Sequence, residues 1–145
     1  MAQYTGRCYC GAQRVSATTA QLAVAYCLCS DCRRLSGAPV AAFAAFAKDS
    51  VSIRPAQMPA ATVTEGVTRW FCPKCGTQLG AAFDYLPGQI YVPLGILDQI
   101  ADLTPERHCH FDARLSWLAL NDDLPKMNGS GRDALNNGSK PESDR

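Results

Sequence analysis

The sequence predicts a mainly β domain with little helix, and two observations lead to that prediction. Short runs of β-branched and aromatic residues recur along the chain. Glycine and proline separate these runs every ~8–12 residues, the spacing expected of an all-β sandwich. A length of 145 residues and a hydrophobic content of 47% fit one domain with a real core.

The expected strands follow one another along the chain. Residues 13–17 and 51–53 alternate in character, and residues 67–71 are rich in β-branched and aromatic side chains. Residues 40–47 are ambiguous because alanine favours helix, but Pro39 and the two phenylalanines suit a buried strand, which we predict. The remaining expected strands are 21–26, 62–65, 79–83, 89–94, 108–111 and 115–120.

One short helix is expected at residues 30–35. Ser30 or Asp31 would cap its start, because short oxygen-bearing side chains satisfy the free N–H groups of a first turn. Gly37 would end it, since glycine readily takes the left-handed conformation of a helix C-terminus. Pro93 lies within an expected strand and should push that strand to a sheet edge or a bulge.

The composition changes near the C-terminus. Residues 128–145 are rich in Gly, Ser, Asn and charged side chains, so we expect a flexible tail after a folded domain at residues 1–127. The net charge of +1 gives no basic stripe, and we therefore expect no nucleic-acid partner. No apolar run reaches the ~18 residues that span a bilayer, so we expect no membrane partner.

The eight cysteines point to metal or thiol chemistry. The N-terminal residues lack the basic start and apolar stretch of a secretory signal, so we expect a cytoplasmic protein. Thiols stay reduced in such a compartment, and clustered cysteines there are typical of metal ligands or catalytic groups. Seven of the eight fall into three clusters, at residues 8–10, 27–32 and 72–75.

The first and third clusters predict one structural zinc ion bound by Cys8, Cys10, Cys72 and Cys75. Cys-x-x-Cys followed by Gly76 forms a tight turn that aims two sulfurs at one point. Residues i and i+2 of a strand face the same side, so Cys8 and Cys10 would supply the other two ligands. The alternatives are a redox pair at Cys72 and Cys75 or buried thiols without metal.

The middle cluster, Cys27, Cys29 and Cys32, offers three sulfurs, one fewer than a closed structural zinc site needs. Three protein ligands and an open position are typical of catalytic zinc. The fourth ligand would be water, a substrate thiol, or one of the residues 108–110, and a protein ligand would make the site structural. We expect solvent or substrate. Simple burial of Cys27 and Cys29 in a strand is the alternative.

Together the clusters resemble one family, the glutathione-dependent formaldehyde-activating enzymes, which share a domain with centromere protein V. The resemblance covers residues 4–127 and is carried by Gly6-Arg-Cys-Tyr-Cys-Gly11, by Cys27-Leu-Cys-Ser-Asp-Cys-Arg-Arg-Leu-Ser-Gly37, by Glu65-Gly-Val-Thr-Arg-Trp-Phe-Cys-Pro-Lys-Cys-Gly-Thr-Gln-Leu79, and by His108, Trp117 and Asp122-Asp-Leu-Pro125. Two positions depart from the family pattern: Leu28 stands where His is frequent, and Cys109 where an aliphatic residue is usual.

The resemblance implies a zinc-bound pair of sheets known as a β-tent. It implies a structural zinc ion on the first and third clusters and a second zinc ion on Cys27, Cys29 and Cys32, which would be the catalytic residues. The implied activity is a carbon–sulfur lyase-type reaction that joins glutathione and formaldehyde as S-hydroxymethylglutathione. Many family members carry the same zinc scaffold with another activity.

The function predicted from these residues is therefore addition of a thiol such as glutathione to a small aldehyde such as formaldehyde. A thiol held at the middle site would ionise near neutral pH and attack the carbonyl carbon. Arg33, Arg34 and Lys74 are candidates to bind the substrate carboxylates, although each alone is more typical of a solvated surface charge. The alternative is a non-catalytic binding module held together by zinc.

Overall fold

Two β-sheets form the protein, whose computed structural model describes residues 2–136. The small sheet has the strand order β1 (Tyr4–Arg7), β2 (Arg14–Ala17), β5 (Val51–Arg54). The large sheet has the order β10 (Arg107–Cys109), β3 (Ala23–Cys27), β4 (Ala41–Ala47), β9 (Gln89–Pro93), β8 (Gln78–Phe83), β7 (Val67–Phe71), β6 (Ala60–Ala61). The described residues include two α-helices, α1 (Ser30–Ser36) and α2 (Arg132–Asn136), so the prediction of a mainly β, two-sheet fold with little helix is confirmed.

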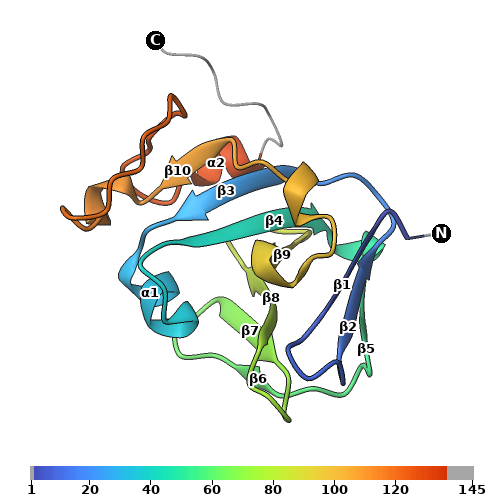
Figure 1. Cartoon of the computed structure of the whole chain (residues 1–145). Helices are drawn as coiled ribbons and strands as arrows, with labels where there is room; N and C mark the ends of the chain where they lie inside the picture. The colour runs from blue at the N-terminus through green and yellow to red at the C-terminus, as the bar shows by residue number, and fades with distance from the viewer. Residues whose placement is uncertain (1, 137–145) are drawn as a thin grey trace.

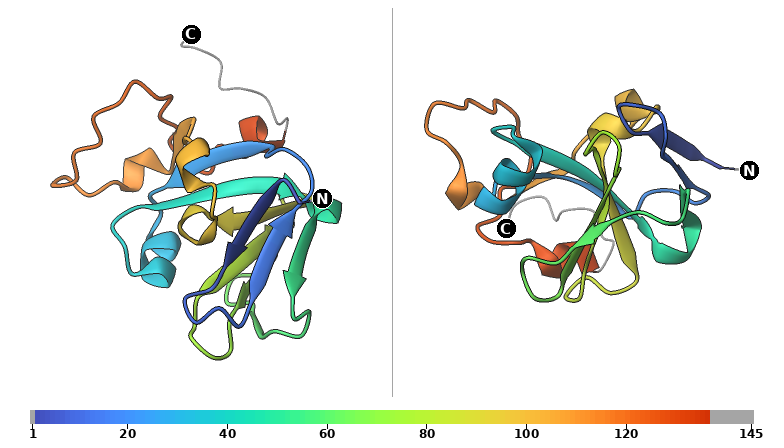
Figure 2. Two further views of the ribbon diagram at one scale, coloured as in Figure 1. Left: turned by 45° about the vertical axis from the view of Figure 1, so that its right-hand side comes forward. Right: turned by 90° about the horizontal axis from the view of Figure 1, so that it is seen from below.

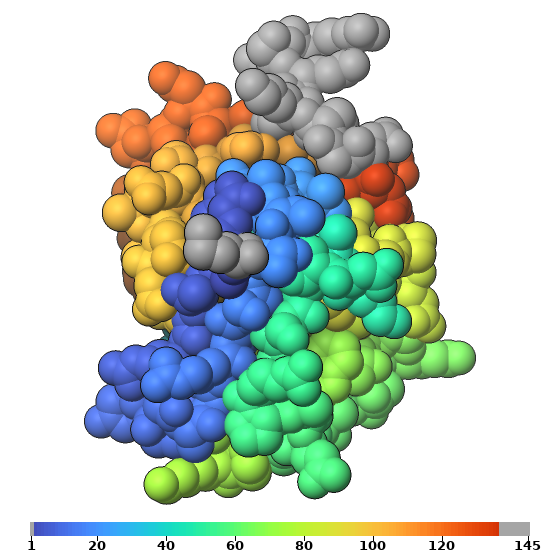
Figure 3. Space-filling model, turned by 90° about the vertical axis from the view of Figure 1, so that its right-hand side faces the viewer, coloured from blue at the N-terminus to red at the C-terminus, as the bar shows by residue number. Residues whose placement is uncertain are grey.

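The small sheet and the strands β6 to β8 of the large sheet lie below β3 and β4 and spread apart from each other there, whereas β10 and α2 lie above these strands (Figures 1 and 2). Figure 3 shows the face that carries the small sheet, with β1 and β2 in blue. Neighbouring strands are antiparallel except β10 and β3, which are parallel and place Cys109 opposite Cys27. Short 3-10 turns at Lys48–Ser50, Leu94–Ile96, Ile100–Asp102 and Phe111–Ala113 complete the connections.

Strand β4 explains why an alanine-rich run is extended here. Phe46 and Ala44 face the core between the two sheets, and Phe43 and Ala45 face a second apolar cluster on the opposite side. A strand that is buried on both faces reads as a continuous apolar run, and the small alanines let the neighbouring layers approach closely. The expected strand at residues 40–47 is therefore confirmed as Ala41–Ala47.

Three local expectations were wrong. Residues 62–65 and 115–120 form no strand, because Val63 and Trp117 lie in segments outside the sheets, with 97% and 68% of their surfaces exposed. Pro93 does not push its strand to an edge. β9 lies between β4 and β8, and Pro93 is its last residue, paired with Phe43, where the missing N–H disturbs the ladder least.

The segment after Met127 also differs from the flexible tail expected there. Leu135, on α2, is buried with 4% of its surface exposed, in the cluster that contains Phe43 and Tyr91. The Gln89 side chain donates a hydrogen bond to the Leu135 carbonyl (3.1 Å). Residues 128–136 thus pack on the domain, and the rest of the expected tail, 137–145, lies outside the described residues.

Candidate metal centres

The first centre is built from two tight turns. Cys8 and Cys10 lie in the turn after β1, not on a strand as expected, and Cys72 and Cys75 lie in the turn between β7 and β8. Gly76, the last residue of the second turn, has a φ of 79° and donates its N–H to the Cys72 carbonyl (2.9 Å). Only glycine takes such a backbone readily, so the sequence fixes where the sulfurs point.

The sulfur positions fit a tetrahedral metal ion. The ligand atoms of Cys8, Cys10, Cys72 and Cys75 all lie within 4.8 Å of one another. The Cys8–Cys10 and Cys10–Cys72 sulfur pairs are 3.6 and 3.8 Å apart. Four sulfurs at ~2.3 Å from a tetrahedral zinc ion would be about 3.8 Å apart. These four cysteines could therefore hold a metal ion.

Hydrogen bonds in the same turns lower the pKa of Cys8 and Cys75, whereas burial and the neighbouring thiols outweigh the Ala12 backbone contact and raise the pKa of Cys10 to about 11. The Gln13 N–H donates to the Cys8 sulfur (3.3 Å). The Thr77 hydroxyl lies 3.1 Å from the Cys75 sulfur. That contact, with backbone N–H groups nearby, lowers the pKa of Cys75 to about 5. A thiol that ionises this easily is suited to metal binding at neutral pH.

The second centre lies where β3 ends and α1 begins (Figure 1). The Cys27 sulfur is 3.4 Å from that of Cys29 and 3.1 Å from that of Cys32. Cys29 caps the helix, since its sulfur accepts the Cys32 N–H (3.3 Å); neither Ser30 nor Asp31 is the cap that we expected. Gly37 ends α1 with a φ of 69°, as predicted.

The three thiols of this cluster differ in their pKa values. Hydrogen bonds from Cys27 and Cys32 hold the pKa of Cys29 far below its usual range. The same contacts, together with burial, push the pKa of Cys27 far above it. The Cys29 sulfur accepts from the Cys27 thiol and from the Cys32 N–H, and the Cys32 thiol donates to the Cys27 sulfur. Such an arrangement favours a thiolate at Cys29 and suits a cation. Leu28, between two of these cysteines, is fully buried, and its N–H donates to the Cys109 carbonyl (3.1 Å).

A fourth donor approaches this cluster from β10. The ligand atoms of Cys27, Cys29 and His110 lie within 4.8 Å of one another. The parallel pairing of β10 with β3 brings His110 there, and sequence reasoning had not expected the segment to pass near. Its neighbours are engaged differently: the His108 ring bonds to Asp122 (2.9 Å), and burial raises the pKa of Cys109 to about 11.

A small apolar cavity adjoins the second centre. Its volume is about 60 Å³, roughly that of two water molecules. It is lined by aromatic rings, by residues of the cluster region and by α2: Ala25, Tyr26, Cys27, Cys32, Phe43, Phe83, Tyr85, Leu86, Tyr91, Cys109, His110, Ser130 and Leu135.

Two arginines that sequence reasoning missed stand over this lining. The Arg69 guanidinium lies 5.5 Å from the Phe83 ring centre, and that of Arg132 lies 4.3 Å from the Tyr85 ring centre. Arg69 lies in the Glu65–Leu79 motif that carries the family resemblance, although no role was assigned to it there, and Arg132 belongs to the segment expected to be a tail. Lys74, one of the three side chains predicted to bind substrate carboxylates, lies in the turn of the first centre.

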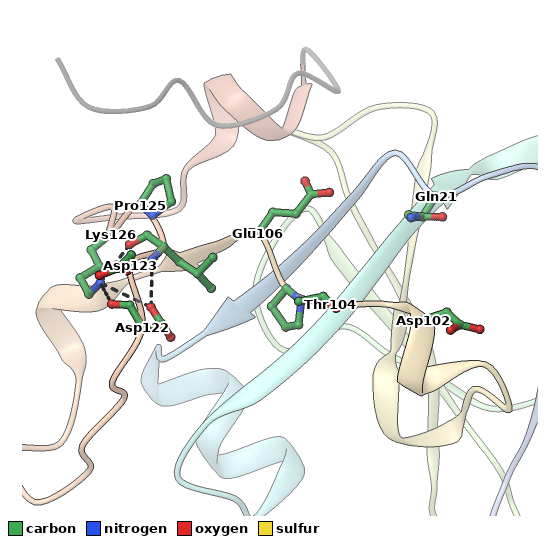
Figure 4. Close-up of a pocket in the computed structure, with 10 residues that line it drawn as sticks. Gln21, Asp102, Thr104, Glu106, Asp122, Asp123, Pro125 and Lys126 are labelled. Atoms are coloured by element: carbon green, nitrogen blue, oxygen red, sulfur yellow. Dashed lines mark hydrogen bonds and ion pairs between the residues drawn. The ribbon is translucent and has the colours of Figure 1, made fainter.

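A wider hollow of about 930 Å³ lies elsewhere, around Asp122 and Glu106 (Figure 4). It contains no cysteine and none of the predicted site residues. Asp122 is already engaged with His108 and with Lys126. These contacts tie the loop at residues 122–126 to β10, so we assign this hollow a structural role.

The chain belongs to the family of glutathione-dependent formaldehyde-activating enzymes, whose model matches residues 3–113. A crystal structure of a protein from Rhodobacter sphaeroides has a similar fold, with a TM-score of 0.55 and 19% sequence identity. The similarity covers 85% of this chain and 99% of that one. A comparison with curated proteins finds no match.

The match to the family model confirms the predicted resemblance and supports, at family level, an activity that uses glutathione and formaldehyde. Within residues 2–136, none of the helices has the length and apolar character needed to cross a membrane.

Proposed function

We propose that this protein is a zinc-dependent enzyme of the carbon–sulfur lyase class that joins a thiol such as glutathione to formaldehyde. The observation that carries the proposal is the convergence of Cys27, Cys29 and Cys32 beside a small apolar cavity. Cys8, Cys10, Cys72 and Cys75 would hold a separate, structural zinc ion. The family match supports the two substrates.

The proposed reaction is an addition in which nothing is oxidised or reduced. The glutathione thiol loses its proton, its sulfur forms a bond with the carbonyl carbon, and the carbonyl oxygen gains a proton to become a hydroxyl group. Zinc bound at the middle cluster would lower the pKa of the thiol. The aromatic lining would keep water from the aldehyde, and Arg69 and Arg132 would bind substrate carboxylates.

We also propose a cytoplasmic location. None of the eight cysteines is in a disulfide bond, and seven of them gather in clusters that need reduced sulfurs. Such an arrangement is expected where glutathione keeps thiols reduced.

One observation favours the alternative of a non-catalytic, zinc-stapled binding module. His110 is close enough to fill the fourth position of the middle cluster, and permanent closure would leave no place for a substrate. Activity, not zinc content, decides between the two functions.

The test is a comparison of the wild type with Cys32→Ser. Zinc content by elemental analysis, circular dichroism and glutathione-dependent consumption of formaldehyde are measured on the same samples. We expect the variant to keep its fold, lose one of two zinc ions and lose activity. A wild type that carries both zinc ions and consumes no formaldehyde with any thiol would support the binding module and contradict the enzyme.

A further inference from the structure

We propose that His110 is the fourth ligand of the metal ion at the middle cluster, which is then a Cys₃His site at rest. The proposal rests on the proposed function in placing a metal ion on Cys27, Cys29 and Cys32. It goes beyond that function by naming a protein ligand where an open position was expected.

The parallel pairing of β10 with β3 places His110 beside the middle cysteine cluster. Cys109 pairs with Cys27 across the parallel strands, and His110 is the next residue. A ring nitrogen of His110 lies within 4.8 Å of both the Cys27 and Cys29 sulfurs. Nitrogen and sulfur ligands of one tetrahedral zinc ion would be about 3.5 Å apart, from bond lengths of ~2.0–2.1 and ~2.3 Å. The donor atoms that lie this close to one another do not include the Cys32 sulfur, so the side chain of His110 or Cys32 would have to shift for all four donors to meet on one ion.

The backbone of His110 takes a left-handed conformation that is uncommon for a residue with a side chain. Its φ is 54° and its ψ is 42°, and it is the one non-glycine residue with positive φ between residues 2 and 136. The left-handed conformation is costly for a side chain with a Cβ, and such strain gathers at ligand clamps. Within the described part of the chain, no hydrogen bond is formed by the His110 ring that would repay this cost.

The turn that carries His110 is fixed in place. Its N–H donates to the Gly129 carbonyl (2.7 Å), and its carbonyl accepts the Ala113 N–H (3.0 Å). The Gly129 N–H in turn donates to the Asp112 carboxylate (3.1 Å). The imidazole is therefore carried by a fixed turn, and Gly129, which lies in the segment 128–145 that we expected to be a tail, helps to hold that turn in place.

The charge balance also favours an imidazole. Three thiolates around Zn²⁺ leave one negative charge, and a neutral fourth ligand adds none beside an apolar cavity. Because the imidazole is the uncharged donor and sits on its own turn, an incoming thiolate would replace it more easily than any cysteine. A closed resting site is then compatible with the proposed reaction.

The experiment compares full-length wild type with His110→Asn and His110→Gly. Asparagine and glycine both tolerate the left-handed backbone, so each variant removes the imidazole without adding strain. Zinc affinity is measured by competition with a chromophoric chelator, and the cobalt-substituted proteins are compared by visible absorption. We expect both variants to bind the second ion at least tenfold more weakly and to show an altered cobalt spectrum, with the first ion unaffected.

Two results would overturn the inference, and they are distinguishable. If Cys32→Ser loses the second ion but both His110 variants retain wild-type affinity and spectrum, His110 is not a ligand and the proposed function stands. If the wild type itself binds a single ion, at the first centre, there is no metal at the middle cluster and both proposals fail.

Discussion

Leu135→Ala tests whether the C-terminal segment is part of the fold. Leu135 is almost fully buried in the apolar cluster of the cavity wall. Truncating a buried leucine typically costs about 2–5 kcal/mol. We expect a value near the lower limit, about 2 kcal/mol, because α2 has only five residues and can detach instead of leaving a sealed void.

The melting temperature converts this cost into a measurable shift. The entropy of unfolding of a chain of this length is about 0.3 kcal/mol/K, so 2 kcal/mol corresponds to a decrease of about 7 °C. The assay is thermal unfolding followed by circular dichroism at one saturating zinc concentration, because bound metal would otherwise shift the midpoint. The variant should still unfold in one transition.

Leu22→Ala is the matched control. Leu22 precedes β3 and exposes 37% of its surface, so the same truncation there should change the melting temperature by a degree or two. Equal melting temperatures for Leu135→Ala and Leu22→Ala would refute the reasoning. The segment after Met127 would then behave as the flexible tail that its composition predicts.

Two further predictions concern the two centres. Cys75→Ser should unfold the domain or lower its melting temperature by more than ten degrees, because the free energy of metal binding at the first centre contributes directly to the stability of the fold. A variant that melts like the wild type would show that no structural metal is bound there. Arg69→Met should raise the KM for glutathione about tenfold, the loss of one charge-assisted contact, with kcat little changed. Arg14→Met, on the exposed side of β2, is its control, and equal KM values for the two variants would remove Arg69 from the substrate site.

Local signals in the sequence predicted the parts of the fold that depend on neighbouring residues. Strand β7 at Val67–Phe71 was predicted to the residue, and α1 was placed to within one residue. Gly37 and Gly76 were correctly assigned to left-handed positions, because a turn of that kind leaves few alternatives to glycine. The grouping of Cys8, Cys10, Cys72 and Cys75 came from spacing and is matched by the sulfur positions.

The errors share a different cause. Residues 62–65 have strand-like composition but no partner strand, and sheet formation depends on a partner that composition does not reveal. Residues 128–136 are mostly polar, yet Leu135 packs against an apolar cluster formed by β4, β9 and the turn at Leu86. A single anchor of this kind is invisible without the tertiary structure.

The second centre depends both on local sequence spacing and on a long-range strand pairing. Sequence spacing groups Cys27, Cys29 and Cys32, because three cysteines within six consecutive residues can bring their sulfurs together by local geometry alone. It leaves the fourth position undetermined, because His110 arrives through a parallel pairing between strands about eighty residues apart in sequence. The residues that follow β10 also contribute Ser130 and Leu135 to the cavity wall, and Arg132 lies over the ring of Tyr85, which lines the same cavity. The long-range contact therefore decides whether the cluster is open or closed, and with it how a substrate thiol would enter.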